Sequence, residues 1–262
     1  MSYFQGQWQN IYNSLLTLNA GDGDYLYGNY SSTTGSSGTY YVAGYGSLLT
    51  PTQQNGVGIT LSLFWRSYTP GTEDPSWHWV SGFGGQGILD AQGNPTISLN
   101  HMLVATDDFP GLAPVGTYAD KLIYTPYPSA AKGHAPADHR KRPGKRGPIA
   151  DPIDGTWVCA SPRVSISLTV EDWDVGWVTG RMSVGGAPAP LVGFVDTRAQ
   201  TANLAYEGIT VASYINGQYV CLCGRLDLAR RQIDVLRLVS GGTASNATYV
   251  QTSVQGFTLV PG

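Results

Sequence analysis

The sequence predicts an all-β protein made of two eight-stranded antiparallel up-and-down β-barrels. The composition is rich in glycine (34), tyrosine (16) and tryptophan (7), while only 13% of the residues are charged. This balance is typical of many short strands joined by glycine-rich turns, and it argues against a coiled coil, a helical bundle or a disordered chain. In addition, strand-like segments recur in the same order in the two halves of the chain, on either side of a basic, proline-containing segment.

The first half contains eight candidate strands separated by turn residues. They are 6–8, 15–19, 27–30, 40–45, 56–65, a strand around 81–82, 96–106 and 116–125, and the run 56–65 is rich in β-branched and aromatic side chains. Sequential antiparallel strands close most simply into an up-and-down barrel, because closure leaves no exposed edge. An eight-stranded barrel is wide enough to hold one small ligand.

The second half repeats this order. Its candidate strands are 155–157, 164–170, 179–182, 190–196, 208–214, a strand around 223–224, 231–240 and 248–260. Both halves open with a Gly-x-Trp strand, Gly6-Gln7-Trp8 and Gly155-Thr156-Trp157. We therefore expect the second half to form a barrel of the same topology.

The segment 129–151 joins the two halves. It carries six basic side chains and a single acidic one before its last residue, and it has no hydrophobic period. We interpret it as a flexible, solvated linker between a domain over 1–128 and a domain over 152–262. The alternatives are a nuclear-localisation or polyanion-binding segment and a site of proteolytic processing.

Several stretches of the first half resemble the avidin/streptavidin family of biotin-binding barrels. They are, in the order of the family, Gly6-Gln7-Trp8-Gln9-Asn10 with Ser14, Gly28-Asn29-Tyr30-Ser31-Ser32, Tyr41-Val42-Ala43-Gly44-Tyr45, Gly58–Trp65, Trp79-Val80-Ser81-Gly82 and Ile97–Thr106. They span almost all of residues 5–125. The second half resembles the family more faintly, through Gly155-Thr156-Trp157 and Thr179-Gly180.

The resemblance implies a site for a cyclic urea. It places Asn10, Ser14 and Tyr30 around the urea oxygen, and Ser32 with a carboxylate, Asp120, at the two urea N–H groups. Such a pocket must pair every polar atom, because burying an amide-like group without a partner costs about 1–3 kcal/mol. Further residues complete the implied site: Trp65 and Trp79 as aromatic walls, Thr34 and Ser36 in a loop over the carboxylate tail of the ligand, and Leu103 on the seventh strand.

The register of three positions stays open. If Trp79 anchors the sixth strand, it forms a second wall; if Ser81-Gly82 anchors it, His78 and Ser76 point inward instead. The carboxylate is Asp120 when the last strand is aligned from its start, and Leu122 takes that place when it is aligned from its end. His101 or Met102 stands where the family carries a further wall tryptophan, so we expect weaker binding than in the family's tight binders.

The second half lacks this polar set. Cys159 stands in the place of Asn10, Arg163 in that of Ser14, Met182 in that of Tyr30 and Val184 in that of Ser32, while Gln255 or its neighbour replaces the carboxylate. We expect this barrel to be structural, with the two barrels associating through their faces as a pseudo-dimer within the chain, and with dimers of chains also conceivable. The alternative is a different ligand held around Arg163.

Together these features predict a non-catalytic protein that binds biotin or a similar small molecule. The alternative is a carbohydrate-binding lectin on the same scaffold, with a surface patch of Trp77, His78 and Trp79. The sequence contains no common catalytic motif and no His or Cys spacing typical of a metal site, so we expect no cofactor besides biotin as ligand. We expect neither nucleic-acid nor membrane partners. Three cysteines and no visible signal sequence favour the cytoplasm, with non-standard secretion as the alternative.

Overall fold

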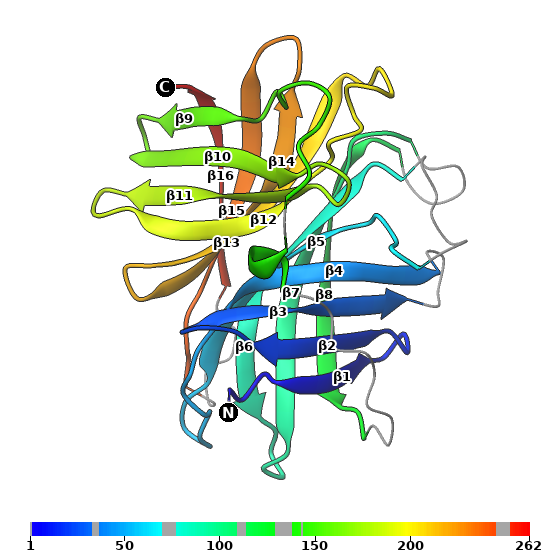
Figure 1. Cartoon of the computed structure of the whole chain (residues 1–262). Coiled ribbons are helices and arrows are strands. Elements are labelled where there is room, and N and C mark those ends of the chain that lie inside the picture. Colours follow the sequence, from blue (N-terminus) through cyan, green and yellow to red (C-terminus); the bar gives the residue numbers. More distant parts are fainter. Residues whose placement is uncertain are drawn as a thin grey trace.

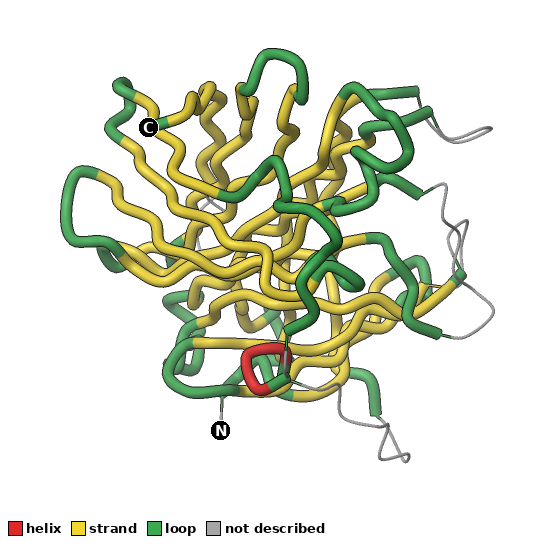
Figure 2. Tube along the Cα trace, turned by 45° about the horizontal axis from the view of Figure 1, so that its top comes forward, coloured by secondary structure: helices red, strands yellow, loops and turns green. Residues whose placement is uncertain are grey.

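The computed structural model contains two closed antiparallel β-barrels, which confirms the predicted fold class. It describes residues 2–32, 37–69, 77–108, 114–128, 138–142, 144–244 and 252–262. Within these residues the only helix is a single 3-10 turn, η1 (His139–Lys141), and nearly all else is strand or turn (Figure 2). No helix in this part of the chain has the length and apolarity that a membrane span requires.

The first barrel is built from the strands β1 (Gly6–Asn10), β2 (Leu15–Ala20), β3 (Tyr25–Ser32), β4 (Gly38–Gly46), β5 (Val57–Phe64), β6 (Trp79–Leu89), β7 (Pro95–Ala105) and β8 (Gly116–Pro126). Each strand pairs with the next, and β8 closes the barrel on β1, with Asn10 opposite Tyr124. The hairpin loops β1–β2, β3–β4, β5–β6 and β7–β8 therefore lie at one end of this barrel, which we call the mouth.

The second barrel repeats this topology with β9 (Gly155–Cys159), β10 (Val164–Asp172), β11 (Trp177–Val184), β12 (Ala189–Val195), β13 (Tyr206–Ile215), β14 (Gln218–Asp227), β15 (Gln232–Ser240) and β16 (Thr252–Pro261). It closes where β16 pairs with β9. Its interior is almost wholly aliphatic, whereas the interior of the first barrel includes four tyrosine, phenylalanine or tryptophan side chains on β3–β6 alone.

The two barrels pack face to face. The outer faces of β4–β7 lie against those of β12–β15, as the blue-to-cyan and yellow-to-orange strands show in Figure 1. This contact has its own buried core, which includes Phe64, Val80, Phe194, Cys221 and Cys223. The sheets approach closely at Gly82, where a Cβ atom would lie 2.6 Å from Cys221 Sγ. A glycine is therefore required on β6 at this point.

The basic segment packs against both barrels in the part that the structure describes. His139 is 4% exposed, and its ring lies against Trp177 of the second barrel and Tyr41 of the first. The guanidinium of Arg140 lies 3.5 Å from the ring centroid of Tyr25. Asp138 and His139 are thus buried, where composition suggested a solvated linker, while Arg140 is exposed. Residues 129–137 and Pro143 lie outside the described residues.

Candidate ligand-binding site

Inward-facing side chains near the mouth of the first barrel form the candidate site. The alternation of β1 and the tight β1–β2 turn bring Asn10 and Ser14 together, with Asn13 at a φ of 62°. Asn10 Oδ1 accepts hydrogen bonds from the backbone N–H groups of Tyr12 and Ser14, each at 3.0 Å. Asn10 Nδ2 is buried and makes no hydrogen bond of normal geometry. The turn thus occupies the oxygen of the Asn10 amide and leaves its N–H groups available.

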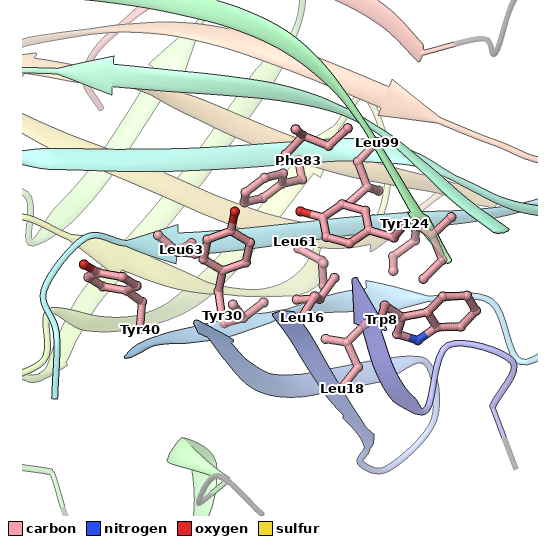
Figure 3. Close-up of a cluster of buried hydrophobic side chains, with 14 of the residues drawn as sticks. Trp8, Leu16, Leu18, Tyr30, Tyr40, Leu61, Leu63, Phe83, Leu99 and Tyr124 are labelled. Carbon is pink, nitrogen blue, oxygen red and sulfur yellow. The ribbon is translucent and has the colours of Figure 1, made fainter. Parts of the chain in front are cut away.

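The hydroxyl of Tyr30 completes this polar cluster. The side chains of Ser14, Asn10 and Tyr124 all face it and partly offset the effect of burial, which raises the Tyr30 pKa. Figure 3 shows Tyr30 and Tyr124 pointing into the same part of the interior from opposite walls. Burial also raises the pKa of Tyr124, so both phenols stay protonated near neutral pH.

A second group of polar atoms continues around the wall, on β5, β6 and β7. Trp65 Nε1 donates to Ser81 Oγ at 2.8 Å, and Ser81 Oγ lies 2.8 Å from His101 Nε2. The Ser81 hydroxyl, which accepts the indole N–H, can in turn donate its own proton to His101 Nε2. Burial lowers the pKa of His101 to about 4, although the Asp120 carboxylate works against this shift. His101 is therefore neutral at pH 7.

Asp120 stands directly opposite His101 in the β7–β8 ladder and is exposed. Paired residues share a face of the sheet, so Asp120 lies on the inward face beside the imidazole. The alternative alignment of this strand put Leu122 in the place of the carboxylate. Leu122 and Tyr124 lie on the same inward face as Asp120, deeper in the barrel. Asn10, Ser14, Tyr30, Trp65, Ser81, His101 and Asp120 thus make a nearly continuous ring of polar atoms around the wall.

Aromatic side chains lie next to this ring. Trp77 and Trp79 stack with their ring centroids 6.1 Å apart, and Tyr40 lies 4.9 Å from Trp65 in an edge-on arrangement. All four are buried in the core of the first barrel. Trp79 therefore anchors the β6 register, as one of the two alternatives predicted, and Leu103 packs against the same core from β7.

The floor beneath the site is closed. Eight inward side chains leave no space for a water molecule between them: Leu16, Tyr30, Val42, Leu61, Leu63, Phe83, Leu99 and Tyr124 (Figure 3). A ligand must consequently sit on the mouth side of this layer. Ser32, at the end of β3, is 5% exposed.

Three expectations about the site need correction or lie outside what is described. His78 does not line the interior: it follows the opposite alternation from Trp77 and Trp79, and its Nδ1 lies 2.5 Å from Asp196 Oδ2 of the second barrel. The surface patch of Trp77, His78 and Trp79 therefore does not form, because both indoles are buried inside the barrel. Thr34, Ser36 and Ser76 lie outside the described residues.

The second barrel also differs from expectation at one position. Asn10 pairs with Ser14 across the β1–β2 turn, whereas Cys159 pairs with Val164. The β9–β10 turn is one residue longer, so Val164, not Arg163, takes the place of Ser14. Met182 is buried in the interior, where Tyr30 stands in the first barrel. The polar set at this end is replaced by a thiol and apolar side chains.

Sequence reasoning missed Tyr124 and Ser81 as site residues. Tyr124 was not named from the sequence, and Ser81 was considered only as a register anchor. The signal for both is the strand alternation, since Tyr124 is two residues from Leu122 and Ser81 two residues from Trp79. Among the described residues, no group of three or more His, Cys, Asp or Glu side chains is arranged to hold a metal ion.

Solved structures of known proteins are similar to this chain. No model of a protein family matches the chain, and no curated protein matches it. The chain is similar to the crystal structure of Xenavidin, with 17% sequence identity and a TM-score of 0.38 over 47% of this chain and 96% of Xenavidin.

Proposed function

We propose that the first barrel binds a small neutral molecule with a ureido or amide head group, biotin or a biotin-like ligand, and that it performs no catalysis on it. The observation that carries this proposal is the buried Asn10 Nδ2 without a hydrogen-bond partner, next to the hydroxyls of Ser14 and Tyr30. An unpaired buried donor costs about 1–3 kcal/mol, and a ligand carbonyl oxygen would remove that cost. The resemblance of these positions to the avidin/streptavidin family points to the same chemistry.

The remaining groups suit the rest of such a ligand. The exposed Asp120 carboxylate can accept an N–H bond, and the imidazole of the neutral His101 lies beside it. Trp65, Trp77 and Trp79 supply apolar surface for the body of the ligand. A pocket with a few convergent polar groups and aromatic walls is typical of small-molecule sites.

Isothermal titration calorimetry with biotin tests the proposal. We expect saturation near one biotin per chain, and a clear loss of affinity in Asn10→Ala. Cys159→Ala is the matched control, because Cys159 holds the corresponding place in the second barrel. If the wild-type protein does not bind biotin, the biotin proposal is wrong, and a glycan array then tests the carbohydrate alternative.

A further inference from the structure

The aromatic wall of the first barrel is attached to the second barrel on its outer side. Strand alternation points Trp65, Trp77 and Trp79 inward, and it points their neighbours Arg66 and His78 outward, toward the second barrel. Both outward residues reach the same acceptor, the carboxylate of Asp196, which directly follows β12.

Asp196 is completely buried between the barrels. Its Oδ2 lies 2.5 Å from His78 Nδ1, and its Oδ1 lies 3.6 Å from the Arg66 guanidinium. The backbone N–H of Arg198 also donates to Oδ1, at 3.2 Å. This carboxylate has partners from both barrels, and removing it would leave Arg66 and His78 without their common acceptor.

Further bonds hold the same edge. Arg66 donates to the carbonyl oxygen of Asp174 at 3.0 Å and to Thr197 Oγ1 at 3.3 Å. Thr210 Oγ1 of β13 donates to the carbonyl oxygen of Ser81 at 3.1 Å. Ser81 is the residue whose hydroxyl joins Trp65 to His101, so the second barrel contacts the backbone of that relay directly.

We propose that Asp196 is a positioning residue, through which the second barrel fixes the place of Trp65, Trp77 and Trp79 in the first. Truncating one partner of a buried, hydrogen-bonded charge pair disturbs the groups that remain, because their charges are then left without an opposite charge in a low-dielectric site. Here those groups are chain neighbours of the wall. The second barrel thus contributes to the site without supplying a side chain to it; the ligand part of this inference rests on the proposed function.

The test compares two substitutions in the contact between the barrels. Asp196→Asn removes the shared charge next to the wall. Thr243→Val is the control: Thr243 Oγ1 accepts from Gln86 Nε2 at 2.7 Å, near the other end of β6 from Trp79. The first readout needs no ligand and is hydrogen exchange of the Trp65 indole N–H by NMR, with the resonance assigned through Trp65→Phe. The second is the rate of biotin dissociation.

We expect Asp196→Asn to speed both exchange of the Trp65 N–H and biotin dissociation by about tenfold or more, and Thr243→Val to change each less than about threefold. Equal effects of the two variants, or none from Asp196→Asn, would overturn the proposal. If wild-type protein binds no biotin, the proposed function fails, while the exchange measurement still decides this inference.

A second pair of variants covers the case in which Asp196→Asn does not fold. His78→Gln keeps a donor for the carboxylate, and His78→Leu removes it. Positioning predicts Trp65 N–H exchange close to wild type in His78→Gln and clearly faster exchange in His78→Leu. The same exchange rate in both would contradict it.

Discussion

Trp8 and Trp157 occupy corresponding places in the two barrels. Trp8 Nε1 donates to the carbonyl oxygen of Phe4 at 2.9 Å, and Trp157 Nε1 donates to that of Ile153 at 2.8 Å. Each bond reaches back four residues, across Gly6 or Gly155, whose φ angles are 133° and 131°. In both barrels this bond fixes the entering chain against the first strand and closes the end away from the mouth.

Because the two barrels share this framework, the residues that differ at their mouths can be compared position by position. The first barrel has Asn10, Ser14 and Tyr30 where the second has Cys159, Val164 and Met182. Both barrels close in the same way, so closure does not require the polar set.

Ser14→Ala and Tyr30→Phe should each weaken biotin binding by about 1–3 kcal/mol, because each removes a donor from the cluster around the ligand oxygen. Calorimetry or competition binding measures the loss. Met182→Leu in the second barrel serves as the control and should leave biotin affinity unchanged. Unaltered binding in both first-barrel variants would place the ligand elsewhere.

Ser81→Ala should lower the free energy of unfolding by about 1–3 kcal/mol, since Trp65 Nε1 loses its acceptor and His101 Nε2 loses its donor in the barrel interior. Urea unfolding followed by circular dichroism measures this change. In 15N NMR of the imidazole, the wild type should show the Nδ1–H tautomer of His101, and the variant should lose that preference. A mixture of tautomers in the wild type would contradict the relay.

His101 and His139 should together make the protein less stable as the pH is lowered from about 6.5 toward 4, whereas the buried Glu207, whose pKa is raised by burial, should oppose this trend. Burial lowers the pKa of His101 and of His139 from 6.5 to about 4 in the folded protein. Between these values the unfolded chain binds protons that the folded chain does not, so the free energy of unfolding decreases with falling pH. Well above pH 6.5, where both histidines are neutral in the folded and in the unfolded chain, these two groups contribute no pH dependence.

His101→Phe isolates one of these contributions. Phenylalanine can keep the stacking of His101 on Phe83, whose ring centroids lie 4.7 Å apart, but it cannot titrate. Urea unfolding at several pH values should therefore give a shallower slope for the variant between pH 6.5 and 4. Identical slopes for variant and wild type would show that His101 binds its proton as readily in the folded state as in the unfolded chain.

Gly82→Ala should destabilise the contact between the barrels by about 1–3 kcal/mol, because the added Cβ would overlap Cys221 Sγ and Cys223 Cβ. Gly241→Ala is the control, since an added Cβ there meets nothing within 4 Å. Thermal unfolding of both variants makes the comparison. Equal melting temperatures would mean that the two sheets can separate slightly at no cost.

The sequence by itself determined the class of fold and most strand positions. Alternating segments such as 96–106 and 231–240 correspond closely to β7 and β15, because the period of two in burial is a local property of the chain. The polar residues at the first mouth were named through the resemblance to the avidin/streptavidin family, and Asn10 and Ser14 do meet because they share one turn.

The tertiary structure alone decided which faces meet. His78 and Trp79 are neighbours in sequence, and local pattern could not say which one faces the interior, because both faces of β6 are buried: one in the barrel, the other against the second barrel. Local pattern could not assign the contacts of Arg66, His139 and Asp196 either, because their partners are distant in the chain. A strand covered on both sides loses the polar face that normally reveals its register, so only the packing of the two barrels could assign it.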